Sequence, residues 1–326
     1  MSQLQDFDNF FNLNGKVALV TGGSRGLGLH AATAFLRAGA KTVFITARKA
    51  EGAQGIDQAV DKLNALPGIK GRAIGIAANV AQEKEVQRLC EEVQKFEPNL
   101  HILVANAGAT WGGPFETTPD WANAKILDLN VRGVFNIVRT YVFFSPSLAP
   151  TTTHNHAHVP RSQEGNPRIL TKEAHTYSFA PLLEKSATST DPARVIVVSS
   201  TAGVNVPHVG ENGTIMYSAS KAAAHHLARN LAVELGPKNI TTNTVAPGFF
   251  PSKLANGLIK NLGGVEHISG TNPRRRLGVP EDIAGVMLFL ASPVAGYING
   301  VDIEVDGGAH LSVGRSTPPG ESKAKL

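Results

Sequence analysis

The chain has 326 residues, of which 42% are hydrophobic and 17% charged, with a formal net charge of +5. This composition is typical of a globular protein with apolar residues for one large core or two small ones. The single cysteine, Cys90, excludes an internal disulfide framework and fits a reducing compartment. No apolar run approaches the ~20 residues that span a bilayer, and no basic-aromatic pattern favours nucleic acid. We therefore expect neither a membrane nor a nucleic-acid partner.

Short runs rich in β-branched residues alternate with helical patterns along the chain. Most of the runs are continuously apolar, which is typical of parallel strands covered on both faces. The expected strands are 16–22, 41–47, 72–80, 100–108, 194–200, 240–248 and 297–308, and the expected helices include 27–40, 83–96, 221–236 and 281–292. This alternation predicts an α/β fold with one doubly wound parallel sheet. We expect a single domain over 1–308, interrupted by 141–178 and followed by a flexible tail at 309–326.

Three glycines follow the first expected strand with G-x-x-x-G-x-G spacing: Gly22, Gly26 and Gly28. Glycine lets a turn approach a pyrophosphate, and the next helix offers free N–H groups and the positive end of its dipole. An ordinary turn is the alternative, since 33 of the residues are glycine. The position between a strand and a helix favours a dinucleotide site.

The choice of cofactor depends on the end of the second expected strand. An NAD site commonly places Asp or Glu there to hold the ribose 2′-hydroxyl. This chain has Arg48 and Lys49 there, with no acid before Glu51, and Arg25 stands within the glycine turn. Guanidinium groups suit a dianionic 2′-phosphate, so the pattern favours NADP(H) over NAD. The alternative is that Arg48 is an ordinary surface residue.

Three further residues suggest carbonyl chemistry. Ser200 ends the fifth expected strand, and Tyr217 and Lys221 are four residues apart, which places both on one face of a helix. Ketone reduction needs an acid that protonates the developing alkoxide, and a nearby ammonium group favours the ionised form of a phenol. Ser200 can donate a hydrogen bond to the carbonyl oxygen. The Tyr-x-x-x-Lys spacing alone is weak evidence, because chance pairs are common.

Six motifs in order resemble the short-chain dehydrogenase/reductase family: TGGSRGLG, ANAG, the Asn of LNVRG, VVSSTAG, YSASK and NTVAPGF. The resemblance covers 13–140 and 179–308. It implies a Rossmann-type sheet, a small-molecule substrate, and association into homodimers or homotetramers. It also implies the catalytic tetrad Asn130, Ser200, Tyr217 and Lys221.

The resemblance assigns a role to each member of this tetrad. Tyr217 is the general acid or base, Lys221 also holds the nicotinamide ribose, Ser200 orients the carbonyl, and Asn130 supports a water relay. Asn106 is expected to brace the sheet beside the cofactor. The expected cofactor contacts are Gly22, Ser24, Arg25, Gly26, Leu27, Gly28, Arg48, Asn79, Asn106, Tyr217, Lys221 and Ser252.

The chain departs from the family pattern at three places. Asn79 stands where an Asp often contacts adenine, and Ser252 replaces a Thr that meets the nicotinamide amide. The 17 residues from Ser200 to Tyr217 exceed the usual spacing, and the extra residues are expected to edge the substrate pocket, with His208 on a mobile lip.

The resemblance is greatest to 3-oxoacyl-carrier-protein reductases, because of the glycine turn, the basic end of the second strand and the stretch RRLGVPEDIA. We expect NADPH-dependent reduction of a 3-oxoacyl thioester or of a polyketide-type ketone. The alternative is a catalytically impaired NADP-binding protein that acts as a redox-responsive partner.

The final residues, Ala-Lys-Leu, are a conservative variant of the Ser-Lys-Leu peroxisomal signal. We expect recognition by a peroxisomal import receptor and a peroxisomal location. A chance match would instead leave the protein in the cytoplasm.

Residues 141–178 are rich in Pro, Thr and His and unlike their surroundings. His154, His156 and His158 alternate, yet no acidic or cysteine cluster accompanies them, so no metal site is expected. A lid is another alternative. If Thr140 is joined to Phe179, an apolar helical stripe continues without a break through Val134, Phe135, Ile137, Val138, Phe179, Leu182 and Leu183. The codons also permit intron-like signals at both ends of the segment and keep the frame on removal. We therefore hypothesise that 141–178 is a retained intron, with a disordered insertion as the alternative.

Overall fold

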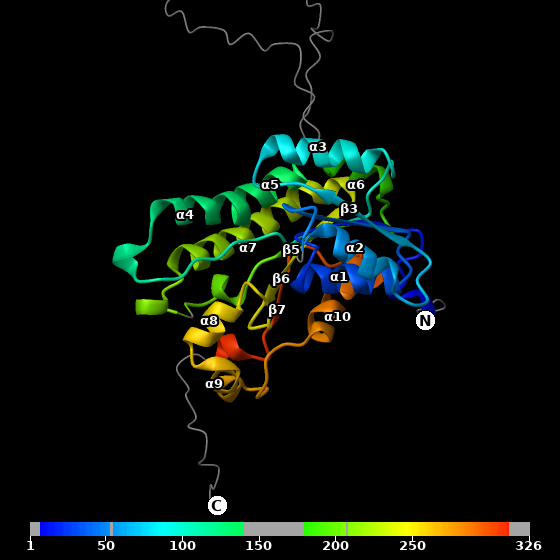
Figure 1. Cartoon of the computed structure of the whole chain (residues 1–326). Coiled ribbons are helices and arrows are strands. Elements are labelled where there is room, and N and C mark those ends of the chain that lie inside the picture. Colours follow the sequence, from blue (N-terminus) through cyan, green and yellow to red (C-terminus); the bar gives the residue numbers. More distant parts are fainter. Residues whose placement is uncertain (1–6, 53–54, 140–178, 207, 313–326) are drawn as a thin grey trace, which may run out of the picture.

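The computed structural model describes residues 7–52, 55–139, 179–206 and 208–312, and seven parallel strands form one sheet across them in the order β3-β2-β1-β4-β5-β6-β7 (Figure 1). The strands are β1 (Val17–Thr21), β2 (Thr42–Ala47), β3 (Arg72–Ala77), β4 (Ile102–Ala105), β5 (Ala193–Val198), β6 (Ile240–Pro247) and β7 (Asp302–Val305). Every expected strand is present, and most end earlier than the apolar pattern suggested. The doubly wound Rossmann-type sheet is confirmed.

Helices connect the strands and cover both faces of the sheet. They are α1 (Gly26–Arg37), α2 (Ile56–Asn64), α3 (Glu83–Gln94), α4 (Asp120–Leu127), α5 (Gly133–Val138), α6 (Ala180–Ser186), α7 (Ile215–Leu235), α8 (Asn256–Asn261), α9 (Gly264–Thr271) and α10 (Pro280–Ala291). The four helices named from the sequence are confirmed. The helix expected from residue 221 begins at Ile215, so α7 also contains Tyr217.

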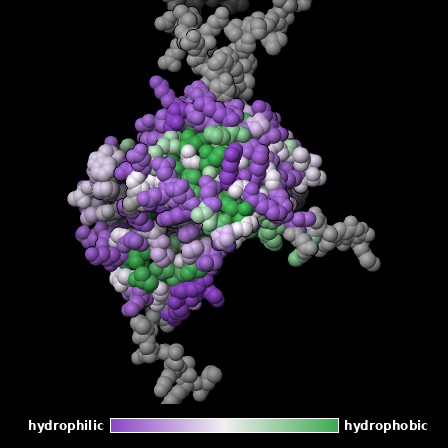
Figure 2. Space-filling model, turned by 45° about the vertical axis from the view of Figure 1, so that its right-hand side comes forward, coloured by the Kyte–Doolittle hydropathy of each residue, from purple (hydrophilic) through white to green (hydrophobic). Residues whose placement is uncertain are grey.

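Two apolar cores lie on opposite faces of the sheet. Val17 and Leu19 of β1 pack toward α3, α5, α6 and α7, whereas Ala18 and Val20 pack toward α1, α2 and α10 (Figure 1). Successive strand residues point to opposite faces, so burial on both faces produces the continuous apolar runs. The outer surface is mostly hydrophilic, with hydrophobic side chains gathered in a few patches on the face in Figure 2.

The order of the strands reverses at β1. β1 pairs with β2 on one side and with β4 on the other, so the loops that follow β1 and β4 leave in opposite directions. In an open parallel sheet, a crevice for ligands forms at the carboxyl ends of strands at this position.

One helical rod, which runs from α4 through α5 to α6, is interrupted at two places. α4 passes through a π-type turn at Asp128–Arg132 into α5, which ends at Val138. The described chain resumes at Phe179, whose N–H donates to the carbonyl oxygen of Ile137 at 3.3 Å. These residues are 42 apart, and without residues 141–178 they would be four apart, which is the α-helical spacing.

The apolar stripe expected across this junction is present with one exception. Val134, Ile137, Val138, Phe179, Leu182 and Leu183 are buried. Phe135 was expected in the stripe but is 42% exposed, with the guanidinium of Arg139 over its ring, so that prediction is wrong. The segment 141–178, and with it the metal, lid and intron alternatives, lies outside the described residues.

The fold continues beyond Gly308, where the sequence suggested that the domain ends. Ala309–Leu311 form a 3-10 turn, and the carboxylate of Asp306 accepts the backbone N–H groups of Gly308 and His310. The Ala-Lys-Leu terminus lies outside the described residues. Within the described part of the chain, no helix is long and apolar enough to cross a membrane, and no group of three or more His, Cys, Asp or Glu residues could hold a metal.

Candidate active site

A cavity of about 610 Å³ opens at the carboxyl ends of the central strands. Its walls come from the β1–α1 turn, the ends of β2, β4 and β5, the first turns of α7, and the segment after β6. The expected site residues that line it are Gly22, Ser24, Arg25, Gly26, Leu27, Arg48, Asn79, Asn106, Ser200, Tyr217, Lys221 and Ser252. Gly28 and Asn130 were also expected in the site but do not line the cavity.

The β1–α1 turn leaves no space for side chains beneath it. Gly22 and Gly26 have φ angles of +64° and +54°, a region that favours glycine. A Cβ at Gly28 would stand 2.6 Å from the carbonyl oxygen of Gly22 and 2.6 Å from Nδ2 of Asn106. Asn106 Nδ2 donates to the carbonyl oxygens of Thr21 and Gly22 at 2.8 and 3.2 Å. Gly28 therefore acts by permitting close packing below the turn, and Asn106 ties β4 to β1.

The cavity carries positive charge at its cofactor end. Arg25 precedes α1 in an extended conformation, Arg48 follows β2, and Lys253 also lines the cavity. No Asp or Glu belongs to its described lining residues. A polyanionic dinucleotide fits this arrangement, because the free N–H groups of a helix N-terminus and guanidinium groups both favour phosphate. The close-packed glycines give the same indication.

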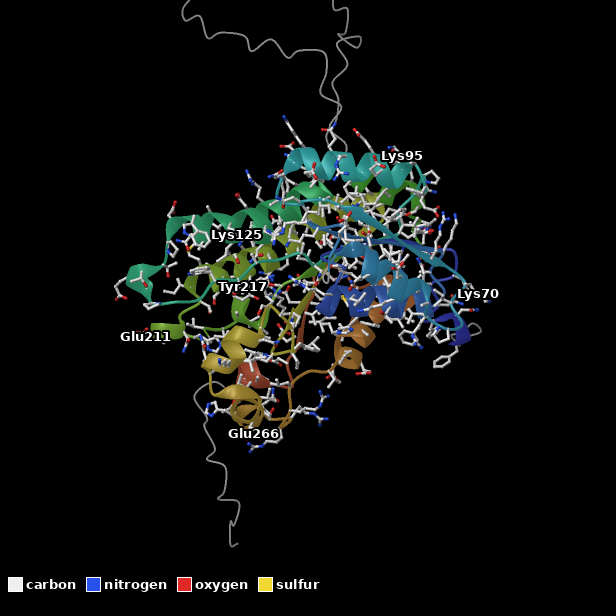
Figure 3. The ribbon with its side chains drawn as sticks, viewed as in Figure 1. Lys70, Lys95, Lys125, Glu211, Tyr217 and Glu266 are labelled. Atoms are coloured by element: carbon white, nitrogen blue, oxygen red, sulfur yellow. The ribbon has the colours of Figure 1, made fainter. Side chains whose placement is uncertain are left out.

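α7 brings the tyrosine and lysine together, one turn apart. The Nζ of Lys221 lies 5.7 Å from the centroid of the Tyr217 ring and donates to the carbonyl oxygen of Val198 at 2.9 Å. Burial lowers the pKa of Lys221 to about 8. Figure 3 labels Tyr217 in the middle of the molecule, between α7 and α8.

The pKa of Tyr217 is raised, because burial disfavours the phenolate more than a hydrogen bond with Ser200 favours it. The sequence argument, in which the ammonium favours the phenolate, does not anticipate this direction. A raised pKa keeps the phenol protonated at neutral pH, which is the form that a general acid needs.

Ser200 is held at the end of β5, where it caps a 3-10 turn at Thr201–Gly203. Its hydroxyl accepts the N–H of Ala202 at 3.2 Å, and its carbonyl oxygen accepts the N–H of Gly203 at 2.9 Å. These bonds fix the backbone of Ser200 beside Tyr217, so the two hydroxyls share one end of the cavity.

Asn130 lies behind this end of the cavity, on the π-type turn. Its Oδ1 accepts from the N–H of Ala109 at 2.8 Å, and its Nδ2 donates to the carbonyl oxygen of Ala109 at 2.9 Å and to Oγ of Ser220 at 3.0 Å. A π-type turn often marks a functional position in a helix. Here the amide joins the β4 loop to α7, and its part in a water relay stays a prediction.

The substrate end is lined by residues for which the sequence offered few indications. His208, expected on a lip, lines the cavity with its ring 5.8 Å from that of Phe249, and burial lowers its pKa. Phe249 was not predicted, and neither was His30 of α1, which lines the cavity near the glycine turn. His30 follows Gly26 by one helical turn, and that spacing is the signal that could have identified it.

Two family models match the chain in succession. Residues 16–144 match the model described as short chain dehydrogenase, and residues 173–310 match the model described as enoyl-(acyl carrier protein) reductase. The matches leave out 145–172, which lies inside the expected interruption.

Relatives and solved structures agree with these matches. The chain is 34% identical over 302 residues to the rhamnolipids biosynthesis 3-oxoacyl-(acyl-carrier-protein) reductase of Pseudomonas aeruginosa, covering 93% of this chain and 99% of the relative. It is 32% identical over 299 residues to the 3-oxoacyl-(acyl-carrier-protein) reductase of Synechocystis sp., covering 91% and 97%. The Pseudomonas aeruginosa RhlG/NADP active-site complex has a TM-score of 0.74 at 34% identity, covering 93% of this chain and 99% of that one.

Proposed function

Since the chain belongs to the short-chain dehydrogenase/reductase family of oxidoreductases, we propose that it is an NADPH-dependent reductase of 3-oxoacyl thioesters. The observation that carries the proposal is the placement of Ser200, Tyr217 and Lys221 in one cavity with Arg25 and Arg48. The names of the relatives from Pseudomonas aeruginosa and Synechocystis sp. support the same substrate class.

The residues at the substrate end have distinct proposed tasks. The reduced nicotinamide, when bound, supplies the hydride that converts the ketone carbon into a secondary alcohol. Tyr217 donates its phenolic proton to the ketone oxygen, and Ser200 donates a hydrogen bond to that oxygen as its negative charge grows. The Lys221 ammonium stabilises the phenolate that Tyr217 leaves behind.

At the other end, Arg25 and Arg48 are proposed to bind the 2′-phosphate of NADP(H), with the glycine turn at the pyrophosphate. Replacing each arginine with alanine should raise the KM for NADPH at least tenfold and leave that for NADH within about twofold. A wild type that prefers NADH would remove the proposed role of Arg48.

The test of the main proposal is NADPH oxidation with a panel of 3-oxoacyl thioesters and polyketide-type aromatic ketones, with Tyr217→Phe as control. We expect turnover of the thioesters, and a 10²–10⁴-fold loss of kcat/KM in Tyr217→Phe, because the acid is removed. Preferred turnover of the aromatic ketones would favour the polyketide alternative. Equal rates for the wild type and Tyr217→Phe would remove the mechanism, and NADPH binding without turnover would favour the redox-responsive partner.

Two further expectations are proposals about the cell. Peroxisomal import through Ala-Lys-Leu is tested by a fluorescent protein fused in front of the tail with and without those residues, since cytosolic signal from both would end the idea. Association into homodimers or homotetramers is tested by light scattering coupled to size-exclusion chromatography. A monomer at micromolar concentration would contradict it.

A further inference from the structure

A buried histidine of α7 lies directly behind the serine of the proposed catalytic set. His225 follows Lys221 by one turn and is 3% exposed. Its Nε2 lies 3.3 Å from the carbonyl oxygen of Ser200, and its Nδ1 lies 2.8 Å from Oδ1 of Asp302, at the start of β7. The other oxygen of Asp302 contacts Arg229, one turn further along α7.

The chemistry of these neighbours determines which nitrogen carries a proton. A carbonyl oxygen can only accept a hydrogen bond, so Nε2 must be the donor to Ser200. The Asp302 carboxylate lies on the opposite side of the ring, where a ring that carries a proton on Nδ1 as well can donate to it, and Arg229 contacts the other oxygen of that carboxylate. The ring therefore lies between Asp302 of β7 and the peptide of Ser200.

The turn that contains Ser200 is pressed against the same part of α7. A Cβ at Gly203 would stand 2.6 Å from the carbonyl carbon of Lys221 and 2.7 Å from Cδ2 of His225. Only glycine allows this approach. The peptide of Ser200 therefore depends on two contacts on this side, the N–H of Gly203 and the ring of His225.

We propose that His225 and Asp302 are positioning residues that hold Ser200 so that its hydroxyl reaches both Tyr217 and the substrate oxygen. This deepens the proposed ketone reductase function and rests on it. The pair acts through the backbone of Ser200 and touches no reacting atom. It differs in this way from Lys221, whose ammonium lies beside the Tyr217 ring.

The kinetic test compares His225→Leu with His225→Gln, which retains an amide donor, and with His226→Leu, an exposed neighbour on the same helix. We expect His225→Leu to lower kcat about 10- to 100-fold, with the KM for NADPH within about twofold, because Ser200 is misplaced while the cofactor end is unchanged. His225→Gln should recover at least a third of kcat, and His226→Leu should match the wild type. Asp302→Asn should give a kcat between that of His225→Leu and that of the wild type. Equal kcat for His225→Leu and His226→Leu would overturn the proposal.

A double-mutant cycle separates positioning from a general loss of structure. In a Ser200→Ala background, His225→Leu should cause less than a twofold further loss, because the group that it positions is already gone. If His225→Leu lowers kcat by the same factor with and without Ser200, then His225 does not act through Ser200.

A second measurement does not need turnover. The chain has four tyrosines, so ¹³C-labelled tyrosine gives few NMR signals, and Tyr217→Phe assigns the one that matters. The Ser200 hydrogen bond lowers the pKa of Tyr217, so His225→Leu should raise that pKa further, whereas His226→Leu should leave it unchanged. An unchanged value in His225→Leu would overturn the proposal even in a protein without reductase activity. Absence of turnover in the wild type would instead overturn the proposed function alone.

Discussion

Two neighbouring helical rods carry three of the four catalytic candidates, and they are built in different ways. α7 is one unbroken helix of 21 residues that holds Tyr217 and Lys221 four residues apart. The rod that runs from α4 through α5 to α6 holds Asn130 on its π-type turn. In α7 local spacing sets the geometry, whereas in the other rod Asn130 is placed by hydrogen bonds to Ala109 and Ser220.

The strongest test of this contrast is at Lys221. Replacing it with methionine should keep α7 helical and lower kcat/KM about 10²–10⁴-fold, since the phenolate of Tyr217 loses its partner charge. Steady-state NADPH oxidation measures the effect. The matched control is Lys125→Met, an exposed lysine of α4 that Figure 3 labels, which should match the wild type. A similar loss in both variants would show that the spacing on α7 has no special role.

In the interrupted rod the expected effect is on stability first. Asn130→Ala removes three hydrogen bonds and leaves Ala109 with unpaired groups, so the free energy of unfolding should fall by about 2–4 kcal/mol. Activity should fall about tenfold, because the β4 loop that borders the cavity loosens. Urea unfolding and steady-state kinetics measure the two effects.

The control for Asn130→Ala is Ser220→Ala, which keeps both bonds between Asn130 and Ala109. It removes the bond from Asn130 to α7 and the bond from the Ser220 hydroxyl to the carbonyl oxygen of Tyr217, and it should cost about 1 kcal/mol. Equal losses in the two variants would mean that Asn130 matters only through α7. That result would contradict its role in joining the β4 loop to the rod.

The pH dependence of kcat/KM should depend on Lys221 of α7 and on no residue of the interrupted rod. Burial lowers its pKa from 10.5 to about 8, so kcat/KM for reduction should fall as pH rises above about 8, when the ammonium is lost. The effect on stability has the opposite sign. Below pH 8 Lys221 is protonated in both the folded and the unfolded chain, so the free-energy cost of burying its charge is fully present. Between pH 8 and 10.5 the folded chain has lost this proton while the unfolded chain still holds it, so the free energy of unfolding rises with pH.

The pH–rate profile of Asn130→Ala should keep the same inflection as that of the wild type, while that of Lys221→Met should lose it. An inflection near pH 8 that survives in Lys221→Met would assign the titration to another group.

The same contrast explains how much of the molecule could be predicted from its sequence. The strands, the glycine turn and the Tyr-x-x-x-Lys spacing depend on local periodicity and on backbone conformations that only glycine adopts easily, so the sequence predicts them. The position of Asn130 outside the cavity depends on hydrogen bonds to Ala109 and Ser220, which are distant in the sequence. The π-type turn and the exposure of Phe135 have no signal in the apolar pattern. The raised pKa of Tyr217 could not be predicted either, because it depends on burial, which outweighs the hydrogen bond with Ser200.

The smallest expected effect on activity comes from removing the second interruption of the rod. The deletion would make α5 and α6 one continuous helix like α7. Deleting 141–178 joins Thr140 to Phe179, whose N–H already bonds to the carbonyl oxygen of Ile137 at 3.3 Å. Because a long closed loop costs entropy, we expect the free energy of unfolding to rise by about 1–3 kcal/mol, with kcat/KM within about twofold.

The control replaces the segment with a Gly/Ser linker of equal length, which should give no comparable gain in the free energy of unfolding. A deletion variant less stable than the full chain would show that the segment contributes to folding, and mature message that contains it throughout would refute the retained-intron hypothesis. A more stable and equally active variant would mean that the register of α5 and α6 is set by their own side chains, as in α7.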